Sequence, residues 1–119
     1  WHDQRLQPYD DYVLFQGQAD SNPCKVGYFN RHGWIGYLHG DVFFCKRFDP
    51  QPSHPHPDFG CNVEVYSKDR FIELETLAPL QRLAPGQSTT HVERWEFYTG
   101  LDTAPTIAGI RALVQALEL

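Results

Sequence analysis

The chain has 119 residues, a formal net charge of −5 and 41% hydrophobic residues, values that fit one globular domain. Because it has no basic cluster and no apolar stretch long enough to span a bilayer, we expect neither nucleic acid nor a membrane as its partner. Nine prolines, nine glycines, eight phenylalanines and six tyrosines are typical of an antiparallel β domain.

Short β-like runs bounded by turn residues follow one another along the chain. The runs cover residues 12–15, 25–29, 34–38, 41–48, 62–66, 70–76, 80–83 and 89–98. Residues 30–33, which end in glycine, predict a hairpin between the second and third runs. Four prolines within residues 50–57 predict an irregular loop, and residues 84–87 predict a turn.

The last part of the chain changes to a helical period. Its apolar positions are Ile107, Ile110, Leu113, Val114 and Leu117. We expect a helix over about residues 104–118, with Thr103 or Asp102 as its N-cap and Pro105 in its first turn. The predicted fold is therefore all-β, with antiparallel strands over about residues 5–98 and one short C-terminal helix.

Cys24, Cys45 and Cys61 are odd in number and include no CxxC pair, so we expect free, buried thiols. Glycine motifs that cradle phosphates are absent, and we expect no cofactor. No signal-peptide pattern occurs, and we expect any sorting signal to lie outside these residues; the compartment stays open.

Residues 62–75 alternate strictly and predict a hairpin. With Lys68 and Asp69 as a two-residue turn, Glu64 pairs with Glu73 and Asn62 pairs with Glu75. One face of this hairpin then points into a core and carries Val63, Val65, Ile72 and Leu74. The other face, which we call the carboxylate face, carries Asn62, Glu64, Tyr66, Phe71, Glu73 and Glu75.

The carboxylate face has two interpretations. Like charges opposite each other destabilise a sheet, so a cation or a hydrogen-bond donor must compensate them. If a lysine or arginine of a neighbouring strand does so, the face is an ordinary solvated surface. Alternatively, its carboxylates, amide and rings bind a hydroxyl-rich ligand such as a sugar, or one carboxylate acts as a general base.

His54, His56 and Asp58 alternate with prolines and could in principle ligate a transition metal. A cupin-type site would place a glutamate where Gly60 or Cys61 stands, so we expect no metal site. A surface loop with incidental histidines is one interpretation, and ligand-facing histidines are the other. His91, Glu93, Trp95 and Phe97 share one strand parity, which indicates a structural strand.

Residues 71–80 and 83–98 resemble the end of a galactose mutarotase-like (aldose 1-epimerase-like) domain, and more closely an uncharacterised bacterial branch of that superfamily. Residues 25–27, 43–44 and 60–66 are similar to the same branch, so the resemblance covers about residues 5–98. It implies the C-terminal half of a β-supersandwich whose concave sheet binds sugars. It also places Glu75 at the general base and Glu73 beside it.

The chain departs from the family at several positions. Thr76 and Leu77 stand where mutarotases have Pro-Gln, and the motif that carries their histidine acid is missing. We therefore expect a carbohydrate-binding domain without the full catalytic machinery. An isomerase that uses Glu75, and a structural or interaction domain, are the alternatives. Half a supersandwich leaves strand edges open, so we also expect a homodimer or pairing with a missing N-terminal half.

Overall fold

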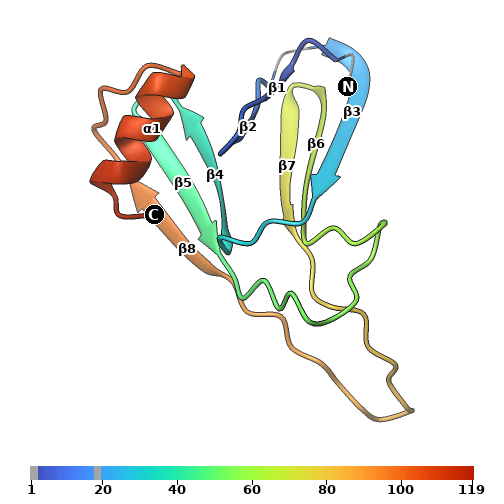
Figure 1. The fold of residues 1–119 in the computed structure, drawn as a ribbon. Helices are drawn as coiled ribbons and strands as arrows, with labels where there is room; N and C mark the ends of the chain where they lie inside the picture. The colour runs from blue at the N-terminus through green and yellow to red at the C-terminus, as the bar shows by residue number, and fades with distance from the viewer. Residues whose placement is uncertain (1–2, 18–19) are drawn as a thin grey trace.

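The computed structural model describes residues 3–17 and 20–119 and consists of short strands followed by one helix (Figure 1). The elements are β1 (Leu6–Pro8), β2 (Val13–Phe15), β3 (Asp20–Tyr28), β4 (Trp34–His39), β5 (Val42–Arg47), β6 (Val63–Asp69), β7 (Phe71–Thr76), β8 (Arg94–Tyr98) and α1 (Ile107–Ala116). All strand pairs in the described residues are antiparallel, so the predicted all-β fold with a C-terminal helix is confirmed.

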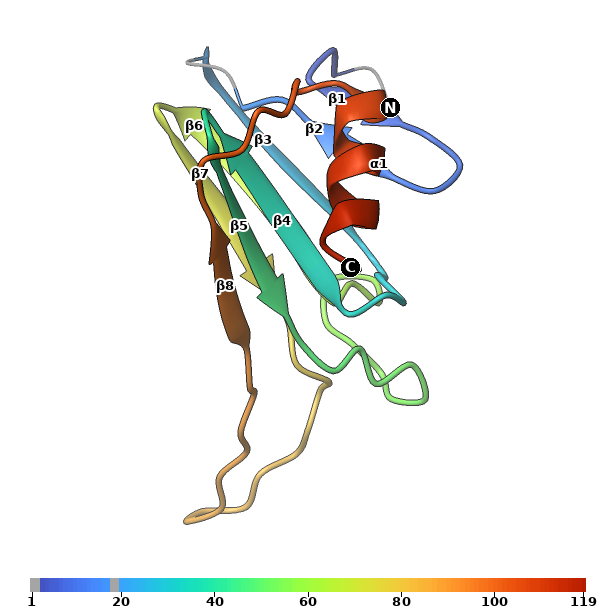
Figure 2. The same ribbon diagram turned by 90° about the vertical axis from the view of Figure 1, so that its left-hand side faces the viewer.

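The strands form two three-stranded sheets, in the orders β3-β6-β7 and β4-β5-β8, and the separate hairpin β1-β2. In Figure 1 the two larger sheets diverge like the arms of a V, and α1 lies against the outer side of β4-β5-β8. Loop 77–93, which joins β7 to β8, extends away from both sheets (Figure 2).

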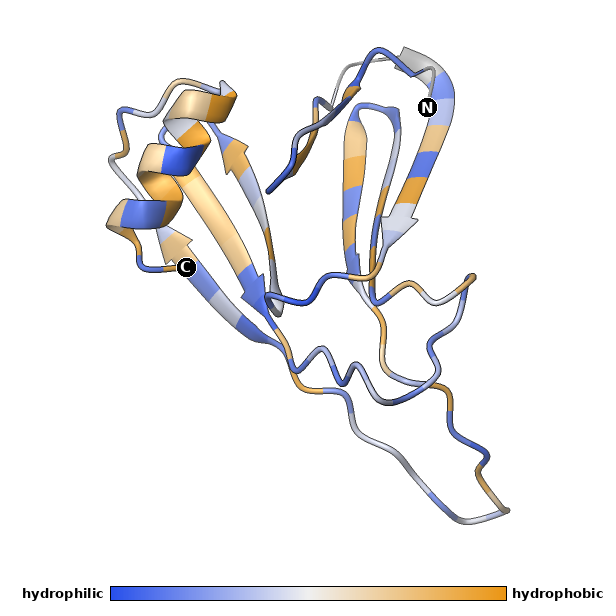
Figure 3. Cartoon of the chain, viewed as in Figure 1, coloured by the Kyte–Doolittle hydropathy of each residue, from blue (hydrophilic) through white to orange (hydrophobic). Residues whose placement is uncertain are grey.

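The core consists of two small clusters. Ile35, Phe48 and Val63 pack between the sheets, where Val65 and Leu74 join them. The second cluster packs beneath α1 and contains Phe43, Cys45 and Leu113. The alternating hydropathy of β7, visible as bands in Figure 3, is what gives its sheet one face toward the core and one face outward.

The predicted hairpin at residues 30–33 is wrong, because β3 pairs with β6 and β4 pairs with β5. Asn30 explains the difference. Its Oδ1 accepts hydrogen bonds from the backbone N–H groups of His32 (2.8 Å) and Gly33 (3.2 Å), and its Nδ2 donates to the carbonyl of Trp34 (2.6 Å). These bonds make a corner that carries the chain from one sheet to the other.

The chain instead forms a hairpin between β4 and β5. His39 pairs with Val42, which leaves Gly40 and Asp41 as a two-residue turn. Gly40 has a φ of +59°, a left-handed conformation that glycine adopts without a steric cost. The Gly-Asp pair is a hairpin signal that the sequence prediction did not use.

The hairpin of β6 and β7 exists, but its predicted register is wrong by two residues. Glu64 pairs with Glu75 and Tyr66 pairs with Glu73, because the turn falls at Asp69 and Arg70 instead of Lys68 and Asp69. Asp69 has a φ of +54°, which aspartate tolerates better than most residues. A shift of two residues preserves side-chain parity, so the two predicted faces of the hairpin remain.

Several further boundaries differ from the predictions: β1 lies outside the predicted runs, and β3 begins at Asp20, not at residue 25. The helix is shorter than residues 104–118, and its N-cap is Thr106, whose Oγ1 accepts from the N–H of Gly109 at 3.2 Å. Pro105 therefore precedes the helix and does not lie in its first turn. Residues 80–83 and 89–93 belong to loop 77–93 and are not strands. The turn at residues 84–87 is confirmed by a 3.0 Å bond from the N–H of Gln87 to the carbonyl of Ala84.

Candidate functional site

The carboxylate face lies on the outer side of β3-β6-β7, because the opposite side holds the core residues Val63, Val65 and Leu74. Lys25, on the neighbouring strand β3, places its Nζ 2.6 Å from Oε2 of Glu64 and 3.6 Å from Oε2 of Glu75. Lys25 is therefore the compensating cation that the two opposed glutamates require. Its position matches the interpretation of this face as an ordinary outer surface.

Glu64 and Glu75 differ in their access to solvent. Glu64 is only 5% exposed and has its charge balanced by Lys25, whereas Glu75 is partly exposed. The hydrogen bond with Glu64 is the main reason that the pKa of Lys25 is raised, ahead of the charge of Glu75; partial burial opposes the shift. Together the three groups form a fixed ion-pair cluster with one net negative charge.

The rest of the carboxylate face is divided between exposed and enclosed groups. Glu73 and Phe71 are exposed, and the rings of Tyr66 and Phe71 lie 5.8 Å apart. Asn62 is fully enclosed: its Oδ1 accepts from the N–H of Asn30 at 2.6 Å, and its Nδ2 donates to the carbonyl of Asn30 at 2.9 Å. Its amide thus supports the corner between the sheets.

The two loop histidines have different surroundings. His54 is exposed, whereas His56 is buried, with Nδ1 3.0 Å from the carbonyl of His54 and its ring 5.1 Å from that of Phe29. Within residues 3–17 and 20–119, no group of three or more His, Cys, Asp or Glu side chains is placed to hold one metal ion. All three cysteines are free, but only Cys45 is buried as expected; Cys24 and Cys61 are partly buried, and removal from solvent raises the pKa of each thiol.

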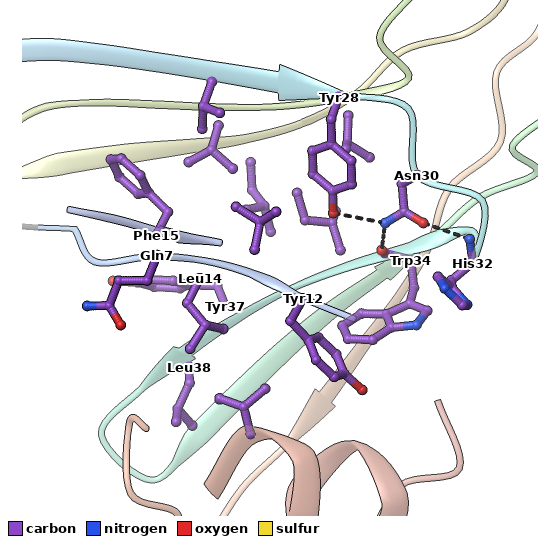
Figure 4. A pocket seen from close by; sticks show the side chains of 18 of the residues that line it. Gln7, Tyr12, Leu14, Phe15, Tyr28, Asn30, His32, Trp34, Tyr37 and Leu38 are labelled. Atoms are coloured by element: carbon purple, nitrogen blue, oxygen red, sulfur yellow. Dashed lines mark hydrogen bonds between the residues drawn. The ribbon is translucent and has the colours of Figure 1, made fainter. Parts of the chain in front are cut away.

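A cleft of about 690 Å³ lies on the inner side of β3-β6-β7 (Figure 4), and Glu64 is the only residue of the carboxylate face among those that line it. It extends from that sheet to β4 and α1, and the β1-β2 hairpin covers part of it. Its aromatic lining includes Tyr12, Phe15, Tyr28, Trp34 and Tyr37. A concave, mainly apolar site of this size is the usual setting for a small-molecule ligand.

Polar groups are spaced among these rings. The hydroxyl of Tyr28 accepts a 3.4 Å hydrogen bond from Nδ2 of Asn30, and Figure 4 shows His32 on the loop that the same asparagine holds. Burial raises the pKa of Tyr28, so its hydroxyl stays protonated and can donate to a ligand. Tyr12 and Trp34 lie side by side with ring centroids 6.4 Å apart. The cleft therefore offers both ring faces and hydrogen-bonding groups.

The β1-β2 hairpin, which we call the flap, pairs with no other described strand. On one side it is tethered to α1, because Arg111 donates to both carboxylate oxygens of Asp11 at 2.6 and 2.9 Å. At its other side Arg5 donates to the carbonyl of Asn22 at 3.0 Å. These polar contacts and the ring contact between Tyr12 and Trp34 attach the flap to the body.

The cleft residues escaped the sequence prediction because they come from segments far apart in the chain. Tyr12, Tyr28 and Trp34 belong to the flap, β3 and β4, and their convergence depends on the corner at Asn30. The one available signal was the density of aromatic residues in residues 9–37, which carry no motif.

A second polar cluster joins β7 to the residues before β8. His91 Nε2 lies 2.8 Å from the hydroxyl of Thr76, which donates to Glu93, and Glu93 also accepts from Lys46 and from the indole of Trp95. Burial acts to raise the pKa of Glu93, but these bonds and the charge of Lys46 lower it overall. These contacts close the base of loop 77–93 and fit the predicted structural role of His91 and Glu93.

No protein-family model, curated protein or solved structure matched this chain. No helix within the described ranges is long and apolar enough to cross a membrane.

Proposed function

We propose that this chain is a carbohydrate-binding domain that holds a hydroxyl-rich ligand in the cleft and does not convert it. The observation that carries the proposal is the cleft of about 690 Å³, whose lining combines the rings of Tyr12, Tyr28 and Trp34 with the tyrosine hydroxyls and the imidazole of His32. Sugar rings present apolar C–H faces, which pack on aromatic rings, and a rim of hydroxyls, which need donors and acceptors. The volume suits one or two sugar rings.

Turnover has less support than binding. Anomer exchange needs a base and an acid, and a positioned acid supplies about 10² to 10⁴-fold in rate. Glu75 could act as a base, but the ammonium group beside it, Lys25, has a raised pKa and is a weak proton donor near neutral pH. Glu75 also lies on the face opposite the cleft. The isomerase alternative would therefore require its ligand on the outer face.

Fluorescence titration distinguishes the two faces, because Trp34 lines the cleft and reports on its occupancy. Glucose, galactose and mannose are titrated into the wild type, Tyr12→Ala and Glu75→Gln. We expect millimolar dissociation constants that Tyr12→Ala weakens at least fivefold and Glu75→Gln leaves unchanged. The opposite pattern would move the site to the carboxylate face, and no response to any sugar would favour a structural domain.

Polarimetry tests the isomerase alternative. We expect anomer exchange of the same sugars to proceed at the buffer rate in the presence of the protein. Exchange well above that rate, abolished in Glu75→Gln, would replace the binding proposal with an epimerase.

A further inference from the structure

β8 is an edge strand with an unusual set of exposed rings. In the sheet order β4-β5-β8, its outer side is unpaired by any described strand (Figure 2). Trp95 and Phe97 are 58% and 64% exposed, and both rings contact Phe44, at centroid distances of 5.5 and 4.8 Å. We call Phe44, Trp95 and Phe97 the aromatic strip. An exposed sheet edge with unpaired backbone groups is a ready template for another strand unless it is blocked.

The total surface of the chain also points to a partner. The chain exposes 8216 Å², whereas a folded monomer of its mass exposes about 6,600 Å². Its radius of gyration of 15.5 Å likewise exceeds the roughly 13.5 Å of a compact domain of this length. The excess of roughly 1,600 Å² on one chain is larger than the roughly 800 Å² that each partner contributes to a standard stable interface.

We propose that a second copy of this chain binds at β8, through antiparallel pairing of the two β8 strands about a two-fold axis at Trp95. This register keeps both aromatic strips on one face of a continuous six-stranded sheet. On the other face it places Arg94 of each copy opposite Glu96 of the second copy. The proposal is independent of the ligand proposed for the cleft.

The charges on β8 favour this register over the one that is shifted by one residue. Centring the axis on Glu96 would place that carboxylate opposite Glu96 of the second copy, which is unfavourable in a sheet. Arg94, whose side chain is 72% exposed, already contacts Glu96 of its own chain and is free to bridge both carboxylates. Hydrogen bonds from Tyr98 and Arg47, and then Arg94, hold the pKa of Glu96 at about 2, so the acceptor stays charged.

Sedimentation velocity over a concentration series tests the interface. Phe97→Lys places a charge on the edge, while Phe59→Lys makes the same change at a fully exposed phenylalanine in the proline-rich loop. We expect a wild-type dimer, at least a tenfold weaker dimer in Phe97→Lys, and no change in Phe59→Lys. Arg94→Glu should also weaken the dimer, and more so at low salt. Circular dichroism confirms that each variant is folded.

Oxidative cross-linking tests the register. In a chain with Cys24→Ser and Cys61→Ser, Trp95→Cys places two thiols across the axis, where facing Cα atoms are about 4.5–5.5 Å apart and a disulfide can form. We expect a covalent dimer from this variant and none from Phe59→Cys. The proposal is overturned by a wild type that stays monomeric at all concentrations, by a dimer that Phe97→Lys leaves intact, or by a β8 edge that captures only an extended peptide.

Discussion

Asn62 and Lys25 show how single polar side chains determine what the two faces of β3-β6-β7 can do. The amide of Asn62 satisfies both backbone groups of Asn30 and so fixes the corner that brings Trp34 toward the cleft. Lys25 relieves the repulsion on the outer face by pairing with Glu64 and Glu75. Asn62 thus supports the candidate site, and Lys25 occupies the carboxylates of Glu64 and Glu75 on the opposite face.

Replacing Asn62 should cost substantial stability. In Asn62→Ala the backbone N–H and carbonyl of the buried residue Asn30 both lose their hydrogen-bond partner. Each buried group left unpaired costs about 1–3 kcal/mol of folding stability. We expect urea unfolding to show a loss of about 2–4 kcal/mol. Gln81→Ala, at an exposed loop position, serves as the control and should stay within about 0.5 kcal/mol. A loss below about 1 kcal/mol in Asn62→Ala would contradict the role given to its amide.

Removing Lys25 should expose the repulsion that it relieves. Lys25→Met leaves the buried carboxylate of Glu64 opposite Glu75 without a cation. Because Lys25 itself is half exposed, we expect a loss of about 1–3 kcal/mol at pH 7, less than for a fully buried pair. Lys68→Met, at an exposed position of β6, is the control.

A double variant checks the cause of this loss. The double variant Lys25→Met, Glu64→Gln should recover most of the loss at pH 7. If it is as unstable as the single variant, lost packing of Lys25 is the cause, and repulsion is not.

At the scale of elements, the local sequence predicted which segments form strands better than it predicted which strands pair with each other. The alternation of residues 62–76 correctly predicted a hairpin with two faces, but the turn shifted by one position in each strand because Asp69 adopts a positive φ. The loop at residues 30–33 looked like a hairpin turn, yet the side chain of Asn30 made it a corner. Sequence spacing alone does not show which of these hydrogen-bond patterns will form.

The flap is joined to α1 by the ion pair between Asp11 and Arg111. Arg111→Ala removes the bonds to Asp11, and because both groups are exposed we expect little change in global stability. Hydrogen exchange of the amides in residues 13–15 should nevertheless become faster, because the flap opens more often. Arg82→Ala, on loop 77–93, should leave that exchange unchanged. Equal protection in both variants would show that the ion pair does not hold the flap.

Acid provides an independent test of the same tether. The hydrogen bond from Arg111 is the main cause of the lowered pKa of Asp11, whose ordinary value is 3.8. The lowered folded-state pKa means that the tether contributes fully above pH 3.8 and is lost only as pH falls through that lowered pKa. We expect the flap amides of the wild type to keep their relative protection at pH 5 and to lose it only in solution more acidic than an unpaired aspartate would require.

At the scale of the whole molecule, two small cores and two divergent sheets leave two apolar regions open to solvent. One of these regions is the cleft beneath the flap, and the other is the aromatic strip at the edge strand β8. The sequence predicted the all-β class, the terminal helix and the two faces of the β6-β7 hairpin. It could not predict the cleft, because the cleft depends on how β3, β4 and the flap are arranged. The sequence of a short strand does not determine which other strands it pairs with.

The most direct test of the account is backbone and indole chemical-shift mapping during titration with glucose, galactose and mannose. The cleft proposal predicts saturable shifts at the indole of Trp34 and at the amides of Tyr12, Asn30 and His32, with the amides of Glu73 and Glu75 unmoved. Shifts confined to Tyr66, Phe71, Glu73 and Glu75 would contradict it and place the ligand on the carboxylate face, and the absence of shifts with every sugar would remove carbohydrate binding altogether.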